Sequence, residues 1–351
     1  MQGRIASFLL LIGLVALTSH AGHAQDYPVR PIKLIVHTTP GSSSDVTARL
    51  VAQDMGRRLG QQMVVDNRAG AGGSIGVDVV AKAPADGYTL LVGASSVMVM
   101  LPAVSKRKLP YDADADFAPI GRIGVSPFLL VVNSQSGIKS LDELLASAKA
   151  KPEKISYASA GPGTNPHMLG EMLSLLSGSP LRHVPYKGPG PAQVDLLGGS
   201  VDMQFDTPSA TQALIRAGKL RALAVTDTTR LAALPEVPTV GELGYPQLQL
   251  LGWTALYAPR ATPPAVLAKL QHTLKETLQS PQVRAKLQAM GDTETDALIG
   301  DALLQEQRKS RARWRRTAAL RSTERGTDRD DKDRAAPGGA RLGLSDAPGA
   351  R

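Results

Sequence analysis

Short apolar segments alternate with longer segments of helical periodicity along most of the chain. IKLIVH (32–37) is apolar and β-branched, and it precedes VTARLVAQDMGRRLG (46–60), where apolar residues recur at helical spacing. The strand-like segments QMVVDN (62–67) and YTLLVGAS (88–95) enclose the helix-like IGVDVVAKA (75–83). This order of strands and helices predicts a parallel sheet with helices on its faces.

A second alternating series begins near residue 126 and is followed by a strand-like segment, 248–259, and a helix-like segment, 263–279. We therefore predict two α/β units of similar size. Periodicity alone leaves open whether the C-terminal part returns to the first unit. The strand-like segments of the second series are 127–133, 154–160, 181–186, 201–206 and 220–227. The helix-like segments between them are 140–150, 167–178, 191–199 and 209–219.

Both ends of the chain depart from this alternation. Arg4, an apolar run (5–17) and small residues up to Ala24 are typical of a signal peptide cleaved after Ala24, which predicts export to the periplasm. The chain contains no cysteine, so we expect neither a lipid anchor nor disulfide bonds. The segment 317–351 is rich in Gly, Pro and charged residues and is predicted to be disordered.

The net charge of +9 comes mainly from the C-terminal end. Residues 308–351 contain 13 Lys and Arg against 6 Asp and Glu, so the rest of the chain is nearly neutral. With aromatic residues at only 4%, this distribution argues against a nucleic-acid-binding surface. His167 and Glu171 are four residues apart, but no complete metal-binding motif is present, and we expect neither a metal nor a cofactor.

Two turns are candidates for ligand binding. VHTTPGSSSD (36–45) and YASAGPGTNPH (157–167) each follow a predicted strand and precede a predicted helix. Ligands of open α/β sheets bind at the carboxyl ends of strands, and the N–H groups at a helix start attract anions. The pair of turns therefore favours an anion site between the two units. The alternative is that both are ordinary connections with helix caps.

A third segment, GAGGSIG (70–76), matches the G-x-S-x-G pattern of a serine nucleophile. A serine hydrolase that uses Ser74 is therefore an alternative function. It is less favoured, because the histidines and the oxyanion motif that such an enzyme needs are not recognisable in the sequence. The other interpretation is a tight loop whose glycines allow backbone to pack against backbone.

Several segments closely resemble the substrate-binding proteins of tripartite tricarboxylate transporters, also called the Bug family. The resemblance extends from about Tyr27 to about Trp314. The matching segments are NRAGAGGSIGVDVVAKAPADGYTLLVG (67–93), LPYD (109–112), DFAPIGRI (116–123), YASAGPGTNPHMLGEM (157–172), HVPYKGPGPAQVDLLGGSVDMQFD (183–206), RLAALPEVPTVGELGYP (230–246) and WTALYAPRATPPAVLAKL (253–270).

The resemblance implies a two-domain periplasmic-binding-protein clamshell, type II-like, with a mostly parallel sheet flanked by helices in each domain. Residues 25–125 plus 247–316 would form one domain and 126–246 the other. The expected function is capture of a small carboxylate and its delivery to integral-membrane permease subunits by a monomeric receptor that is not an enzyme. A ligand-sensing receptor subunit for signalling is the alternative.

The resemblance also implies which residues hold the ligand carboxylate. Thr38 stands where the family usually has an aromatic residue and Ser42 where it has a glycine, so a more polar ligand is expected. The predicted binding residues of the first turn are Thr38, Thr39, Gly41, Ser42, Ser43, Ser44 and Asp45, and those of the second are Ser159, Ala160, Gly161, Gly163 and Thr164. Ser95, His167, Lys187, Gly188 and Asp206 are further candidates from other matching segments.

Overall fold

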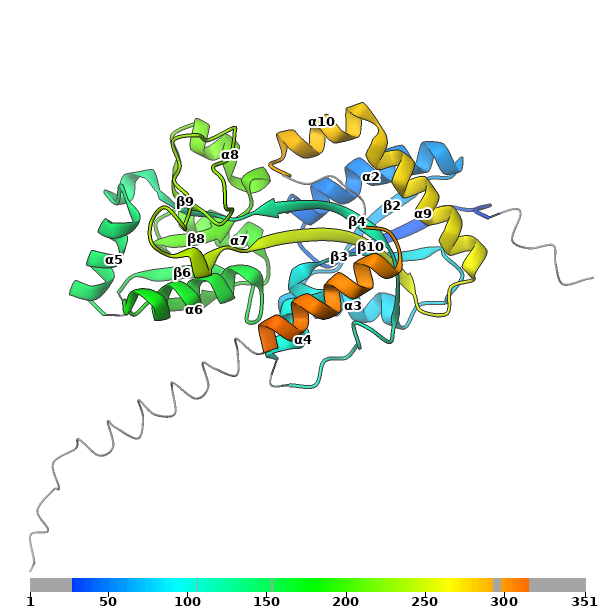
Figure 1. Ribbon diagram of the computed structural model, residues 1–351, viewed down its shortest axis with the longest axis horizontal. Coiled ribbons are helices and arrows are strands. Elements are labelled where there is room, and N and C mark those ends of the chain that lie inside the picture. Colours follow the sequence, from blue (N-terminus) through cyan, green and yellow to red (C-terminus); the bar gives the residue numbers. More distant parts are fainter. Residues whose placement is uncertain (1–26, 106, 153, 293–297, 316–351) are drawn as a thin grey trace, which may run out of the picture.

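The computed structural model describes residues 27–105, 107–152, 154–292 and 298–315, so the predicted signal peptide and C-terminal tail lie outside the described residues. The strands of the described residues form two five-stranded sheets, each flanked by helices (Figure 1). The predicted α/β class, with two units, is confirmed.

The first sheet has the strand order β2-β1-β3-β10-β4. Strands β2, β1 and β3 are parallel, whereas β10 pairs antiparallel with both β3 and β4. The C-terminal part of the chain therefore returns to the first sheet. The strands are β1 (Ile32–Val36), β2 (Met63–Asn67), β3 (Thr89–Ala94), β4 (Phe117–Pro127) and β10 (Leu251–Pro259).

Side chains of β1 alternate between the two faces of this sheet, as the period of a strand requires. Ile32, Leu34 and Val36 pack into one core with α2, α9 and α10, whereas Ile35 packs into another with α3 and the last helix. The helices are α2 (Ser43–Leu59), α3 (Ser74–Ala81), α9 (Pro264–Gln279), α10 (Pro281–Ala289) and a helix over 301–315.

The second sheet has the order β7-β6-β8-β5-β9, in which β5 is antiparallel to both of its neighbours. Leu130 and Val132 face α5 and α6, and Leu129 and Val131 face α7 and α8. The strands are β5 (Leu129–Asn133), β6 (Ser156–Ser159), β7 (Arg182–Pro185), β8 (Met203–Asp206) and β9 (Leu220–Val225). The helices are α5 (Leu141–Ala150), α6 (Asn165–Ser177), α7 (Pro189–Leu197) and α8 (Pro208–Arg216).

The chain crosses between the two sheets after β4 and again before β10, and Figure 1 shows these long strands side by side. Thr226, which is fully buried, joins the two crossings. Its backbone N–H donates to Phe128 O, and its backbone carbonyl accepts from Leu250 N. Its hydroxyl accepts from Phe128 N at 2.8 Å and donates to Leu250 O at 2.7 Å.

Several elements were not predicted from the pattern. They include β4, α10, and the helical segment formed by η2 (Ser96–Met100) and α4 (Leu101–Val104). The reason is clearest for β4, which is buried on both faces and contains Pro119, Gly121 and Gly124. Burial on both faces removes the alternation that identifies a half-exposed strand.

The glycine-rich segment 70–76 brings backbone close to backbone. A Cβ atom at Gly76 would lie 2.8 Å from Arg68 O and 2.9 Å from His37 Cα, so α3 approaches the end of β1 only because this side chain is absent. A Cβ atom at Gly73, where φ is +98°, would lie 2.7 Å from Cδ2 of the His37 ring. This packing agrees with the interpretation of the segment as a tight structural loop.

Gly76→Ala is therefore expected to destabilise the protein by about 1–3 kcal/mol, the usual range for overpacking. The control is Gly198→Ala at the end of α7, where φ is −82° and the nearest atom to a new Cβ is 3.5 Å away. That change is expected to be neutral or slightly stabilising. Urea unfolding monitored by circular dichroism measures both, and equal effects would contradict the packing argument.

Candidate functional site

A cavity of about 130 Å³ lies between the two sheets and is lined by residues of both. The strands β1, β3, β6 and β8 end at it, since His37, Ala94, Ala160, Asp206 and Thr207 are among its lining residues. A cavity of about 150 Å³ is known to hold benzene, so this volume suits a small organic molecule.

Helices α2, α3, α6, α7 and α8 all begin at this cavity. The first or capping residues of each line it. A helix start carries roughly half a positive elementary charge, which results from its unpaired N–H groups. The cavity therefore favours a negative group without a salt bridge to a side chain. The lining residues at these helix starts are Ser42, Ser43, Ser44, Gly73, Thr164, Asn165, Pro166, Gly188, Pro189 and Thr207.

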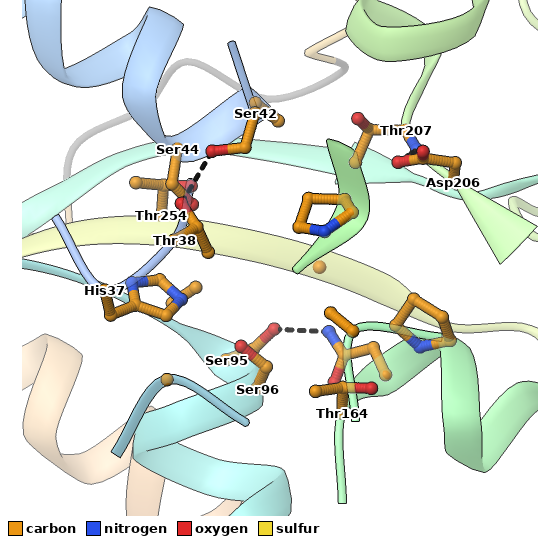
Figure 2. Close-up of a pocket in the computed structure, with 18 of the residues that line it drawn as sticks. His37, Thr38, Ser42, Ser44, Ser95, Ser96, Thr164, Asp206, Thr207 and Thr254 are labelled. Atoms are coloured by element: carbon orange, nitrogen blue, oxygen red, sulfur yellow. Dashed lines mark hydrogen bonds between the residues drawn. The ribbon is translucent and has the colours of Figure 1, made fainter. Parts of the chain in front are cut away.

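The first turn presents backbone donors to the cavity. Ser42 is the N-cap of α2, and its hydroxyl accepts from Asp45 N at 3.3 Å. The hydroxyls of Thr38 and Ser42 are 2.6 Å apart and hydrogen-bonded (Figure 2). Within the described part of the chain, the N–H groups of Ser43 and Ser44 have no hydrogen-bond partner. They are available to a bound anion.

The Asp45 carboxylate fixes the shape of this turn through hydrogen bonds. Its carboxylate accepts from Gly41 N at 2.9 Å, Arg49 Nε at 3.1 Å and Asn67 Nδ2 at 3.0 Å. Burial raises the pKa of Asp45, but these hydrogen bonds from Arg49, Gly41 and Asn67 lower it more, so the pKa lies below its usual range. The carboxylate is therefore ionised at neutral pH.

The second turn is held together by its own side chains. Ser159 Oγ accepts from Gly161 N at 3.1 Å and lies 2.6 Å from His183 Nε2. Thr164 Oγ1 donates to Gly161 O at 2.7 Å. Gly163 N donates to His167 Nδ1 at 3.2 Å, and neither residue lines the cavity. Thr164 and Ala160 are left to face the cavity.

The cavity brings together ten of the predicted site residues. These are Thr38, Ser42, Ser43, Ser44, Ser95, Ala160, Thr164, Lys187, Gly188 and Asp206. The others lie next to the cavity but do not line it: Thr39, Gly41, Asp45, Ser159, Gly161, Gly163 and His167.

Further lining residues were not predicted. His37 and Asn165 belong to the two quoted turns, so their position next to the serines could have indicated them. Trp253 and Thr254 lie on β10, whose place in the first sheet periodicity did not reveal. Asp292 belongs to no recognisable motif, and no signal in the sequence indicates it.

His37 is an uncharged acceptor in this cavity. Its Nδ1 is 3.0 Å from Val92 O and must donate to this carbonyl, which leaves Nε2 as the acceptor. Burial lowers the pKa of His37 to about 4, although the hydrogen bond to Val92 acts in the opposite direction. The ring is therefore neutral at physiological pH.

Two carboxyl groups face the cavity from different units. Asp206 ends β8, and its oxygens accept from Thr207 N at 2.8 Å and Gln204 Nε2 at 2.9 Å. Asp292 follows α10. Burial raises the pKa of each to about 7. Figure 2 shows Asp206 and Thr207 on one side of the cavity, with Thr38, Ser42 and Ser44 on the other.

The two units touch on several sides of the cavity. Asn165 Nδ2 donates to Ser95 Oγ at 2.9 Å, which links the start of α6 to the end of β3. A Cβ at Gly188 would lie 2.7 Å from Thr39 Cγ2, and one at Gly72 would lie 3.3 Å from Pro162 O. The two units are therefore in direct contact around the cavity.

Ser74 does not line the cavity, is buried, and donates its hydroxyl to Ala71 O at 3.0 Å in the first turn of α3. Among the described residues, no group of His, Cys, Asp and Glu side chains is arranged to hold a metal ion. Within the same residues, no helix is long and apolar enough to cross a membrane.

A cavity between two linked α/β units, with helix starts directed into it, defines a cleft-type ligand-binding protein. The family model described as "Tripartite tricarboxylate transporter family receptor" matches residues 47–315. The chain belongs to this family of periplasmic solute-binding proteins.

Named relatives agree with this assignment. Protein BugT of Bordetella pertussis is 41% identical over 82% of this chain and 87% of its own length. The structure of the periplasmic binding protein BugD is 34% identical with a TM-score of 0.79, covering 85% of this chain and 98% of that one. MatC from Rhodopseudomonas palustris, solved with bound malate, is 31% identical with a TM-score of 0.77, covering 83% and 100%.

Asp45→Asn is expected to destabilise the protein by about 1–3 kcal/mol at pH 7, because buried donors lose a charged acceptor. The folded-state pKa of Asp45 lies below its unfolded value. Its stabilisation is therefore present above the unfolded pKa and is lost as the pH falls through the folded one. The difference in melting temperature from wild type should shrink between pH 7 and pH 3.

The matched control is Asp142→Asn in the first turn of α5, where the side chain is exposed. An exposed substitution of this kind typically changes stability by less than about 0.5 kcal/mol. Thermal melts of both variants across the pH range separate the two cases. A pH-independent effect of Asp45→Asn would contradict the assigned role of the charge.

Proposed function

We propose that this chain is an exported receptor that captures a small carboxylate in the cleft and delivers it to integral-membrane permease subunits. The proposal is supported by family membership and by MatC and a Rhodopseudomonas palustris relative, whose structures contain malate and adipate respectively. We infer that a signal peptide ending at Ala24 directs export and that the receptor acts as a monomer.

The observation that carries the proposal is the convergence of helix starts on one cavity. The free N–H groups of Ser43 and Ser44 lie at the start of α2, opposite the start of α6 at Asn165. Such groups hold a carboxylate through hydrogen bonds and the helix dipole, and they do not need a paired lysine or arginine. The hydroxyls that surround them add donors without adding charge.

Ser43→Pro tests this directly. Ser43 is the first residue of α2, where proline is well tolerated, and Ser42 has the extended ψ of 161° that suits a residue before proline. The substitution removes the N–H. We expect a 10- to 100-fold loss of affinity for the bound carboxylate by isothermal titration calorimetry, since a hydrogen bond to a charged group contributes about 1.5–3 kcal/mol.

Ser43→Ala is the control, because it removes the hydroxyl and keeps the N–H. A panel of mono-, di- and tricarboxylates screened by thermal shift identifies the ligand for this titration. A bound ligand at a hundred times its dissociation constant stabilises the native state by about 2.7 kcal/mol. If the proline and alanine variants bind the carboxylate with equal affinity, the backbone N–H of Ser43 does not bind it.

We further infer that the two units are domains, 25–125 plus 247–316 and 126–246, which close on the ligand about the crossings at Phe128 and Leu250. This division is supported by the sheet to which each strand belongs. Closure of two domains about a few linking residues is a common response to ligand binding. The closed form would be the one presented to the permease.

Gly188→Ala is expected to weaken ligand binding about 5- to 100-fold, because the new methyl group meets Thr39 only when the cleft is closed. The φ of Gly188 is 169°, an extended conformation that alanine adopts without strain. Adding Thr39→Ser removes the threonine methyl group that the new alanine side chain would meet, and it should restore most of the affinity. Calorimetric titration of both variants checks this, and failure of the double variant to recover would rule out a contact across the cleft.

A further inference from the structure

A groove on the first unit is lined mainly by charged residues and shares no lining residue with the ligand cavity. It has a volume of about 920 Å³ and lies between the loop that follows α4 and the last helix (Figure 1). Six Arg and Lys residues line it, against three Asp. Five of these six cationic side chains are exposed, and they define the basic groove: Arg107, Lys108, Arg260, Arg308 and Arg315.

The three aspartates of the groove are already bound by the fold. The Asp112 carboxylate accepts from the backbone N–H of Asp114 at 2.8 Å and of Ala115 at 3.0 Å, and these hydrogen bonds hold its pKa below the usual range. Asp116 accepts from Asp112 N at 2.6 Å. Asp114 accepts from Arg311, a buried side chain, at 2.7 Å. The aspartates therefore shape the floor of the groove.

The five exposed cations lack matching negative charges. Arg308 Nε is 3.6 Å from Asp114 Oδ2, but this carboxylate is already held by Arg311. The other four members of the basic groove form no ion pair within the described part of the chain. Cations gathered around one hollow create a positive potential, which favours a partner with several negative charges.

The floor of the basic groove is bonded to a segment that reaches the ligand cavity. Arg311 Nη2 donates to Met98 O at 2.8 Å, and the Tyr111 hydroxyl donates to Val97 O at 2.6 Å. Both carbonyls belong to η2, which begins at Ser96, a lining residue of the cavity. The groove and the cavity are therefore built on the same helical segment.

This segment also touches the second unit. A Cβ at Gly163 would lie 2.6 Å from Leu101 Cδ1 and 3.6 Å from Val104 Cγ2, so α4 packs against the second turn. The chain then continues from α4 into the wall of the groove at Ser105. A partner bound in the basic groove would therefore be in a position to distinguish different arrangements of the two units.

We propose that the basic groove binds an acidic periplasmic segment of the permease. The inference rests on the proposed function, because it names the surface by which the receptor engages the permease. External loops of membrane proteins carry few Lys and Arg, so their Asp and Glu side chains remain available. A polypeptide segment suits a hollow between a loop and a helix, whereas the exposed Asp112 among the cations disfavours a flat layer of anionic lipid.

The first experiment measures binding of a fluorescein-labelled hexaglutamate peptide to the purified protein by fluorescence anisotropy. Arg107→Glu combined with Arg260→Glu is expected to weaken binding about tenfold or more, because each change replaces an attraction with a repulsion. Binding to the wild type should also fall steeply between about 50 and 500 mM salt. An absence of binding to the wild type at low salt would overturn the inference.

Two control variants change the net charge by the same amount elsewhere. Lys139→Glu with Lys219→Glu reverses exposed lysines that line neither the cavity nor the groove. Arg321→Glu with Arg325→Glu tests the C-terminal tail. Each should change hexaglutamate affinity less than about twofold. If either control loses as much affinity as the groove variant, the peptide is held by general charge or by the tail, and the inference is wrong.

Sedimentation with vesicles of phosphatidylglycerol and phosphatidylcholine separates a peptide partner from a lipid surface. The groove variant and the wild type are expected to bind these vesicles equally. If vesicles compete with hexaglutamate and the groove variant no longer binds them, the groove takes anionic lipid and the inference is overturned.

Uptake by cells tests the permease itself, with the carboxylate that the thermal-shift panel identifies. Arg107→Glu with Arg260→Glu should keep carboxylate affinity within about twofold, because neither residue lines the cavity, and should lower uptake about tenfold or more. Selection for restored growth on that carboxylate should return Lys or Arg substitutions in a periplasmic segment of the permease. Uptake at the wild-type rate would contradict the inference.

The outcomes also separate this inference from the proposed function. If Ser43→Pro abolishes uptake and the groove variant leaves it unchanged, the receptor function stands and only the docking surface is refuted. If cells that lack this protein take up every carboxylate of the panel at the wild-type rate, the proposed function fails and the docking proposal fails with it.

Discussion

The hydrogen bonds of Thr226 hold together the only covalent links between the two sheets within the described residues. Phe128 leaves the first sheet and Leu250 returns to it, and Thr226 bonds to both. Because the crossings are fixed side by side, the strand ends of both sheets face one another across a single cleft. In the proposed closure, the movement between the units would be confined to a few residues near Thr226, which would keep the two turns opposite each other.

Local patterns were enough to predict the elements with a continuous signal. The helical spacing in α2 comes from residues that face a core on one side and solvent on the other, and β1 is a run of apolar, β-branched residues that is buried on both faces. β4 gave no such signal, because Pro119, Gly121 and Gly124 interrupt its apolar residues. The antiparallel place of β10 in the first sheet depends on contacts between residues far apart in sequence, which no local period records.

The same distinction applies to the site. Ser42 to Ser44 could be predicted because a helix cap and a ligand-binding turn need the same glycine and serine residues. Asp292 could not be predicted, because it reaches the cavity through contacts between residues far apart in sequence, such as that of its carboxyl group with Gly124. Ser159 illustrates a limit of the motif, since its hydroxyl bonds to Gly161 in the turn and to His183 on β7, and the residue does not line the cavity.

The charges around the cavity determine which ligand stabilises the closed form. A ligand shifts a conformational equilibrium only by the difference between its affinities for the two states. Closing the cleft around water alone would leave the helix starts directed at a cavity that contains no anion. A bound carboxylate supplies the missing negative charge, so a cleft built in this way would couple closure to the chemistry of its ligand.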